Sequence, residues 1–561
     1  MTPALPAKAF THRFLPGLLR LLPATCCLFF AVALLTAVAA PILRRTTGTP
    51  TSVATAAAYL SGFILCIWGL RKVGPTADLR AAWLIILLAA ILRFTLAFSV
   101  PTDLPLNTDQ ALFRKFAITL ADQGRNLGTL GELSRDGDYF VWAGRVFPIH
   151  EGIRNLFGQN DLHIMRAVNV TTSVLVLMLV LYATCVLLPS GTRRWPVFFL
   201  AALPFQTYWV ADYTHHLYSS TYLFAFACAL LALTRTCQLW RKVLLSGTMS
   251  LLLLLMRWHG GIDRLAIGLV VGTGIIRLFS STPKKYALQD ICWSIVVPIA
   301  CMVLLAGPLL LDEIRVGNRH QMDSHGWGFL ARGWCQESGG EYYAPFEQMM
   351  SEYPPEQKPL LMKKILLEEI RDTPIGAYAR LPVIKTGKLF LVGYANNWEE
   401  SLQMLRSPAL PILRGLRQAG AIAFLFFVFW GSLELIQHIR SADTSWLMFL
   451  LLPLLAWGAY VVCGETSPRY SVYVQPVMAL MAGVAFLPPS MAKPSSRLGN
   501  SILPITLAML LLISLFAAIR LGAQLIPSPV IPARAAANTS PTFTSASPSD
   551  LLSATLETTT P

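Results

Sequence analysis

Asp109 is the first residue whose type and position suggest chemistry. It opens a helix-like pattern in PLNTDQALFRKFAITLADQG (105–124), which follows an apolar segment and precedes a long polar loop. Burying a carboxylate near a membrane core costs several kcal/mol unless it is paired or hydrated, so such acids often serve a function. Aspartate is also a preferred N-cap residue. The residues alone leave both roles open for Asp109.

Two arginines could bind a phosphate. Arg257, in MRWHGGIDR (256–264), closes one apolar run before a glycine turn and the next run. Arg469 precedes Tyr470 at the outer mouth of a later span, in GETSPRYSVYVQP (464–476). A guanidinium suits the geometry of a phosphate, whereas arginine and tyrosine at span ends also serve as interfacial anchors. Phosphate binding and anchoring are therefore both open.

Adjacent histidines form a third candidate site. His215 and His216 lie with Asp212 in a short outer loop, ADYTHHLYSS (211–220). They could bind a metal ion, contact a polar substrate or belong to a plain interfacial turn. Neighbouring histidines point in different directions and no third ligand is defined, and the ten cysteines contain no C-x-x-C spacing. We therefore expect no defined metal site, with a divalent metal as the weaker alternative.

The elements that hold these residues are predicted to be membrane-spanning helices. Of the 561 residues, 54% are hydrophobic and 13% are charged, with a mean hydropathy of +0.54, whereas about 25% of residues are charged in soluble domains. Apolar runs of about twenty residues, the length of a spanning helix, recur along the chain. The predicted fold is an all-α polytopic membrane protein of about 13 transmembrane helices, with two long outward-facing loops that carry amphipathic helices.

The apolar runs divide the chain into six parts. In order they are the N-terminal spans (1–99), the first outer loop, which contains Asp109 (100–166), the central spans (167–311), the second outer loop (312–418), the C-terminal spans (419–520) and a Ser/Thr/Pro-rich tail expected to be disordered (521–561). The expected spans are 17–41, 52–70, 81–99, 167–188, 195–212, 217–234, 243–257, 265–280, 290–311, 419–437, 444–463, 470–487 and 501–520. The second loop contains an amphipathic stretch, KKILLEEIRDTPIGAYARLPVIKTGKLFLVG (363–393), predicted to form helices that break at Pro374 and Pro382.

The net charge of +15 follows from the expected topology. Basic residues collect in the cytoplasmic loops of polytopic membrane proteins, so we expect no nucleic-acid partner. With the N-terminus in the cytoplasm, the short inner loops contain Arg71, Lys72, Arg193 and Arg194. This orientation places both long loops outside, on the periplasmic face of the inner (plasma) membrane if the source is bacterial.

The first outer loop resembles that of the GT-C class of integral membrane glycosyltransferases, which includes the protein mannosyltransferases and the lipid A aminoarabinose transferases. In that class an acid in this loop precedes an aromatic residue, an alanine, a leucine and a glycine. The corresponding residues are Asp109, Phe113, Ala117, Leu120 and Gly124.

Further motifs of the class follow in the same order, so that the resemblance covers residues from about 80 to 490. FPIHEGIRNLFGQNDLHIMRAVNV is similar to the far end of the first loop, with His150 and Glu151 where the class commonly has Pro and Gly. Arg257 with its glycine turn, and Arg469 with Tyr470, match two later motifs. The end of the second outer loop matches at Lys385, Lys388 and Phe390.

The resemblance implies a glycosyltransferase that moves a hexose or pentose from a polyprenyl-phosphate carrier to a lipid, glycan or protein acceptor, with inversion at the anomeric carbon. It implies Asp109 as the catalytic base and three donor-phosphate ligands, Arg257, Arg469 and Lys385. The candidates for substrate binding are His150, Glu151, His215, His216 and Tyr470.

Three other classes of protein remain as alternatives. An O-antigen polymerase or ligase also has many spans and large outer loops, but the early acid with its helix and the late Arg-Tyr motif argue against it. A transporter or flippase often has two related halves, and the sequence shows no repeated halves. A non-catalytic scaffold is the third, and substitution of Asp109 should barely affect it.

Overall fold

A computed structural model describes part of the chain. The described residues are 21–38, 50–100, 108–123, 148–257, 262–278, 288–304, 319–341, 357–390, 407–438 and 445–487, apart from positions 214, 290, 302 and 337, together with 348 and 353. They belong to the first of two compact units, 1–495 and 496–561. Asp109 and Arg257 are placed by their backbone only, and the expected span 501–520 and the tail lie outside the described residues.

Every secondary-structure element among the described residues is an α-, 3-10 or π-helix, and no strand occurs there. Within the described residues, eight helices are long and apolar enough to cross a membrane. They are Leu21–Val38, α2 (Pro50–Arg71), Pro75–Ser99 with α3 (Asp78–Ser99), His150–Leu187 with α7 (Pro148–Phe157) and α8 (Asp161–Leu187), α11 (His216–Arg235), α12 (Leu239–Arg257), α21 (Ala409–His438) and Ser445–Cys463, which joins α22 (Ser445–Trp457) to the π-helix η6 (Gly458–Cys463). The all-α polytopic class is confirmed, whereas the larger span count is not.

Several expected spans are short or interrupted. The segment 195–212 is three pieces: α9 (Arg194–Ala202), α10 (Pro204–Tyr208) and η3 (Trp209–Ala211). The break falls at Leu203, which has an extended ψ of 112°, because a residue before proline avoids the α region. The expected span 470–487 corresponds to η7 (Pro468–Tyr473) and the ten-residue α23 (Gln475–Val484). The expected span 265–280 corresponds to α13 (Asp263–Leu278), which has 16 residues.

The two prolines of the segment predicted to be the second outer loop behave differently. Helix α18 (Lys358–Asp372) ends before Pro374, as predicted. The predicted break at Pro382 is wrong, because α19 (Ile375–Leu389) continues through it. Proline fixes a φ that is itself helical, so it removes one backbone hydrogen bond without ending the helix. The Thr386 hydroxyl donates to the Pro382 carbonyl at 2.6 Å.

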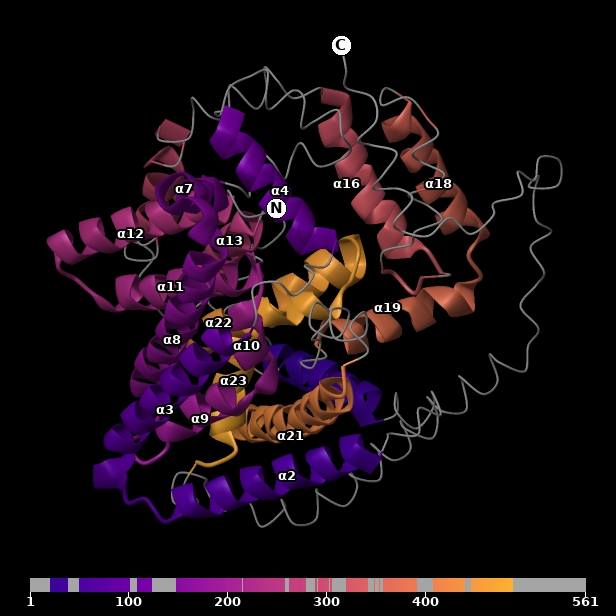
Figure 1. The fold of residues 1–561 in the computed structure, drawn as a ribbon. Helices are drawn as coiled ribbons and strands as arrows, with labels where there is room; N and C mark the ends of the chain where they lie inside the picture. The colour runs from indigo at the N-terminus through magenta and orange to yellow at the C-terminus, as the bar shows by residue number, and fades with distance from the viewer. Residues whose placement is uncertain are drawn as a thin grey trace, which may run out of the picture. The chain divides into compact units, whose positions relative to one another are not determined.

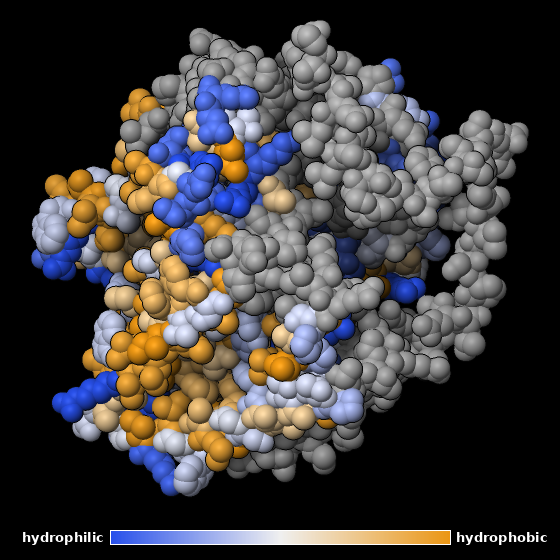
Figure 2. Space-filling model, viewed as in Figure 1, coloured by the Kyte–Doolittle hydropathy of each residue, from blue (hydrophilic) through white to orange (hydrophobic). Residues whose placement is uncertain are grey.

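The bundle is built around α23, whose ten residues are all buried. This helix contacts α8, α9, α21 and α22, while α8 also packs against α3 and α11, and α21 packs against α2 (Figure 1). Helix α16 (Arg319–Trp334) packs against α18. Apolar residues dominate the visible face over α3 and α8, whereas polar residues gather near α4 and α7 (Figure 2). Exposed residues of α3 such as Leu84, Leu87 and Leu88 suit contact with lipid.

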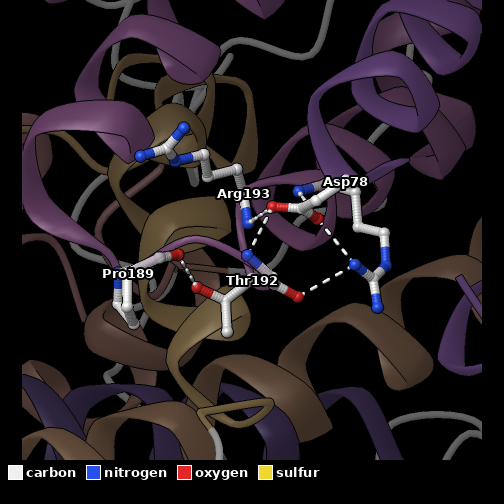
Figure 3. A network of polar contacts seen from close by, with 6 residues as sticks. Asp78, Pro189, Thr192 and Arg193 are labelled. Atoms are coloured by element: carbon white, nitrogen blue, oxygen red, sulfur yellow. Dashed lines mark hydrogen bonds and ion pairs between the residues drawn. The ribbon is translucent and has the colours of Figure 1, made fainter. Parts of the chain in front are cut away.

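A buried polar network joins the start of α3 to the start of α9 (Figure 3). Asp78 accepts hydrogen bonds from the backbone amides of Gly191 and Arg193, both at 2.9 Å. Arg194 Nη1 lies 2.6 Å from Asp78 Oδ1. These contacts satisfy a carboxylate that would otherwise be costly to bury, and they fix one end of the bundle.

Candidate functional site

Helix α4 (Thr108–Gln123) carries the predicted catalytic acid. It begins at Thr108, so Asp109 lies inside the first turn and not at the N-cap. One face of α4 packs against the bundle: Phe113, Phe116 and Leu120 are buried in a cluster with Ile153, Leu162, Met165, Tyr213 and Tyr218. Since residues four apart share a helix face, Asp109 lies one turn before Phe113 on that side of α4. An acid in a first turn is also favourable to the helix dipole.

Polar contacts attach the same helix to the bundle. The backbone amide of Tyr213 donates to Gln110 Oε1 at 3.1 Å. Arg114 makes two hydrogen bonds to Asp161, at 2.9 and 3.0 Å. Gln110 and Arg114 are four residues apart, so both contacts come from one side of α4.

His150 and His215 lie under the first turns of α4. The ring of Phe113 is 6.4 Å from that of His150 and 5.6 Å from that of His215, between centroids. His150 is fully buried, 5.0 Å from the ring of Tyr213, and its Nδ1 is 3.5 Å from the Tyr218 hydroxyl. Both histidines therefore lie beside the helix that carries Asp109.

Arg469 and Tyr470 approach the same histidines from η7. Burial, together with the nearby His150 and the positive charge of Arg469, lowers the pKa of His215 to about 3. His215 is therefore neutral across ordinary pH. The His215 and His216 rings are 4.3 Å apart, and the ring of Tyr470 is 6.3 Å from that of His216.

A tyrosine that the sequence analysis did not single out completes this side of the cluster. The His216 Nδ1 is 2.8 Å from the Tyr473 hydroxyl. Tyr470 stacks on Tyr460 of η6 with centroids 4.5 Å apart. A π-helix often occurs at a functional site, and here η6 contributes Tyr460, which packs against η7.

Lys385 attaches α19 to the segment that precedes Arg469. Its Nζ donates to the Gly464 carbonyl at 2.7 Å and to the Gly333 carbonyl at 2.9 Å. The side chain is 1% exposed, and burial lowers its pKa to about 8. A Cβ on Gly333 would collide with the backbone of Gly464. A Cβ on Gly464 would in turn collide with the ring of Phe329, so both glycines are needed for this close approach.

An ion pair strengthens the same junction. Arg332 Nε, near the end of α16, lies 3.1 Å from Glu465 Oε2. The Glu465 amide donates to the Phe329 carbonyl at 3.0 Å.

The structure thus brings together most of the residues predicted from the sequence. His150, His215, His216, Arg469 and Tyr470 form one cluster beside α4, and Lys385 lies at the adjoining junction. Glu151 follows His150 in α7. Arg257 is the last residue of α12, and its side chain lies outside the described part.

Sequence reasoning missed several polar residues of this region. They are Gln110, Arg114, Asp161, Tyr213, Arg332, Glu465 and Tyr473. The only signal was their polar type inside apolar or amphipathic segments. Among the described residues, no group of three or more His, Cys, Asp or Glu side chains could hold a metal ion.

Comparisons with known proteins find little in sequence. No protein-family model matches the chain, and no curated protein matches it. A search of solved structures finds a likeness to the archaeal oligosaccharyltransferase AglB from Archaeoglobus fulgidus, in complex with an inhibitory peptide and a dolichol-phosphate. The TM-score is 0.40 with 13% identity, over 78% of this chain and 54% of AglB. At this level the likeness transfers neither residue roles nor an activity, and the chain spans only about half the length of AglB.

Proposed function

We propose that the chain is an integral membrane glycosyltransferase that moves a sugar from a polyprenyl-phosphate carrier to a cell-envelope acceptor. The observation that carries the proposal is the convergence of three elements: the first turn of α4 with Asp109, the histidines of α7 and the α10–α11 connection, and η7 with Arg469. An acid, a guanidinium and a group of buried polar rings are what transfer from a lipid phosphate requires.

In the proposed reaction, an acceptor hydroxyl or amine attacks the anomeric carbon from the face opposite the phosphate. The new bond joins the acceptor oxygen or nitrogen to that carbon, and the carbon–oxygen bond to the phosphate breaks with its electron pair on the phosphate. The acceptor proton moves to the Asp109 carboxylate. The configuration therefore inverts. A well-placed general base contributes about 10²–10⁴-fold to the rate.

The leaving phosphate needs cations more than it needs a strong acid. Arg469 is the first candidate because it belongs to η7, whose Tyr470 and Tyr473 lie near His216, and Arg257 is the second. Their guanidinium groups would stabilise the growing charge where water is scarce. Lys385 is already bonded to two carbonyls, so its part in phosphate binding would pass through the junction that it holds.

The remaining candidates would shape the sugar or acceptor site. His150, His215 and His216 offer ring nitrogens, and Tyr470 offers an aromatic face and a hydroxyl. Glu151 adds a second carboxylate in α7. We place this site on the outer face of the plasma or inner membrane, with a cytoplasmic N-terminus, because this orientation puts the basic short loops inside.

The proposal is tested by deleting the gene and profiling cell-envelope glycans and lipids by mass spectrometry. The expected result is one missing sugar, which wild-type protein restores and Asp109→Asn does not, at equal abundance in the membrane. Asp122→Asn is the matched control, since Asp122 is an exposed acid at the other end of α4. Restoration by Asp109→Asn, or an unchanged envelope after deletion, would contradict the proposal and favour a transporter or scaffold.

A further inference from the structure

The contact between Arg114 and Asp161 has a defined geometry. Arg114 Nε donates to Asp161 Oδ2 at 3.0 Å, and Arg114 Nη2 donates to Oδ1 at 2.9 Å. Asp161 begins α8 and its side chain is fully buried, and Arg154 Nη1 lies 3.8 Å from Oδ1. Two parallel hydrogen bonds fix both the distance and the rotation of the partners.

Stability alone is a weak reason for such a pair. Replacing a buried ion pair by apolar residues of similar size is often neutral or stabilising, and the best-attested use of buried charge is to fix register. The other contacts of α4 are mostly apolar, through Phe113, Phe116 and Leu120. Apolar burial is not directional, so those contacts alone would allow a small slip or rotation of the helix.

A small slip would matter for the residue at the start of α4. One residue of register moves a helical position by about 1.5 Å along the axis and about 100° around it. Arg114 is five residues after Asp109, about 7.5 Å along the axis. Gln110 accepts a hydrogen bond from the Tyr213 amide. The contacts of Arg114 and Gln110 together determine where residue 109 lies relative to His150 and His215.

We propose that the Arg114–Asp161 pair is a positioning device that sets the rotation and register of α4 and thereby aims Asp109 at the site. The inference rests on the proposed function of Asp109. Neither member of the pair touches the reacting atoms. A misplacement of about 1 Å can cost about 10²-fold in rate, so loss of the pair should lower transfer far more than it lowers folding.

The test uses the full-length chain with Arg114→Met and Asp161→Asn combined. This double variant removes both charges and leaves the fully buried position 161 nearly unchanged in size. The matched control is Arg194→Met with Asp78→Asn, because it removes a buried Arg–Asp pair that joins other helices, while the Asn oxygen can still accept from the amides of Gly191 and Arg193. Three quantities are measured: the restored envelope sugar, thermal unfolding in detergent, and binding of a short-chain polyprenyl phosphate without sugar by calorimetry. Asp109→Asn is assayed in parallel.

The expected result is a loss of about 10²-fold in transfer, with unfolding and carrier binding close to those of the wild type. The control pair should retain transfer. Arg114→Lys, which keeps the charge but cannot form two parallel bonds, should also lose transfer, and it remains informative if the double variant does not fold. Wild-type transfer by either Arg114 variant while Asp109→Asn is inactive overturns this inference alone. Wild-type transfer by Asp109→Asn overturns the proposed function itself.

Discussion

Replacing Lys385 by methionine should change how stability depends on pH. In the structure the ammonium is 1% exposed and donates to the carbonyls of Gly333 and Gly464. Burial lowers its pKa from 10.5 to about 8. The unfolded chain therefore binds this proton more tightly than the folded chain does. The penalty on folding is complete below about pH 8 and disappears as the pH rises towards 10.5.

The size of the effect follows from the pKa difference. Each pKa unit corresponds to about 1.4 kcal/mol, so the penalty at pH 7 is about 3 kcal/mol and falls by about 2 kcal/mol by pH 9.5. Methionine removes this term. It also leaves two carbonyls without their donor, at about 1–3 kcal/mol each. The two costs oppose each other at pH 7, so the pH dependence is more decisive than the stability at one pH.

The measurement is reversible unfolding in mixed detergent micelles at pH 7 and pH 9.5, for the wild type and Lys385→Met. The wild type should gain about 2 kcal/mol over this range relative to the variant. Lys388→Met, which removes the next ammonium along α19, reports the effect of losing a half-buried lysine that pairs with Glu341. An equal pH dependence in the wild type and Lys385→Met would refute the claim that Lys385 is buried as a charged group.

Three further predictions concern the same region. Gly333→Ala should lower the yield of folded protein in size-exclusion chromatography, because its Cβ would collide with Gly464. Arg332→Met should cost about 3–5 kcal/mol in detergent unfolding, since it leaves Glu465 buried without this cation. With a folded pKa of about 3 for His215, the unfolded chain binds the proton more tightly. The wild type should therefore lose about 2 kcal/mol between pH 6.5 and 4.5, and His215→Gln should lose less.

Each of these predictions has a contrary outcome. A wild-type yield for Gly333→Ala would mean that α16 does not approach the η6–η7 connection closely, and Gly376→Ala is the control because nothing lies within 4 Å of its added Cβ. A loss below about 1 kcal/mol for Arg332→Met, the range of exposed pairs, would mean that the pair is hydrated. If the stability of His215→Gln fell between pH 6.5 and 4.5 as much as that of the wild type, His215 would be accessible to water.

The helix after Asp109 was predictable because its pattern is local. Phe113, Phe116, Ala117 and Leu120 recur at helical spacing, and the structure buries all four. The chain needs no distant information to place an apolar face on a helix. The same reasoning located the long spans, whose length and composition are properties of single segments.

The partners of the polar residues were not predictable in this way. Arg114 pairs with a residue 47 positions away, and the Lys385 contact with Gly464 spans 79 positions. No periodicity encodes such pairs, because they depend on which helices become neighbours. The interruption of the expected span 195–212 had a local signal in Pro204, but the high apolar content of the segment predicted one continuous helix. The continuation of α19 through Pro382 depends on its packing, since several following residues, including Lys385 and Leu389, are buried.

The central claim is that a lipid-linked phosphate binds between the start of α4 and η7. Photo-crosslinking with a diazirine-bearing polyprenyl phosphate, followed by peptide mapping of the full-length protein, tests it most directly. The account predicts attachment within about one helical turn of Asp109 and of Arg469, abolished by an excess of unlabelled carrier. Attachment confined to the exposed faces of α2 and α3, or attachment that unlabelled carrier does not displace, would contradict it.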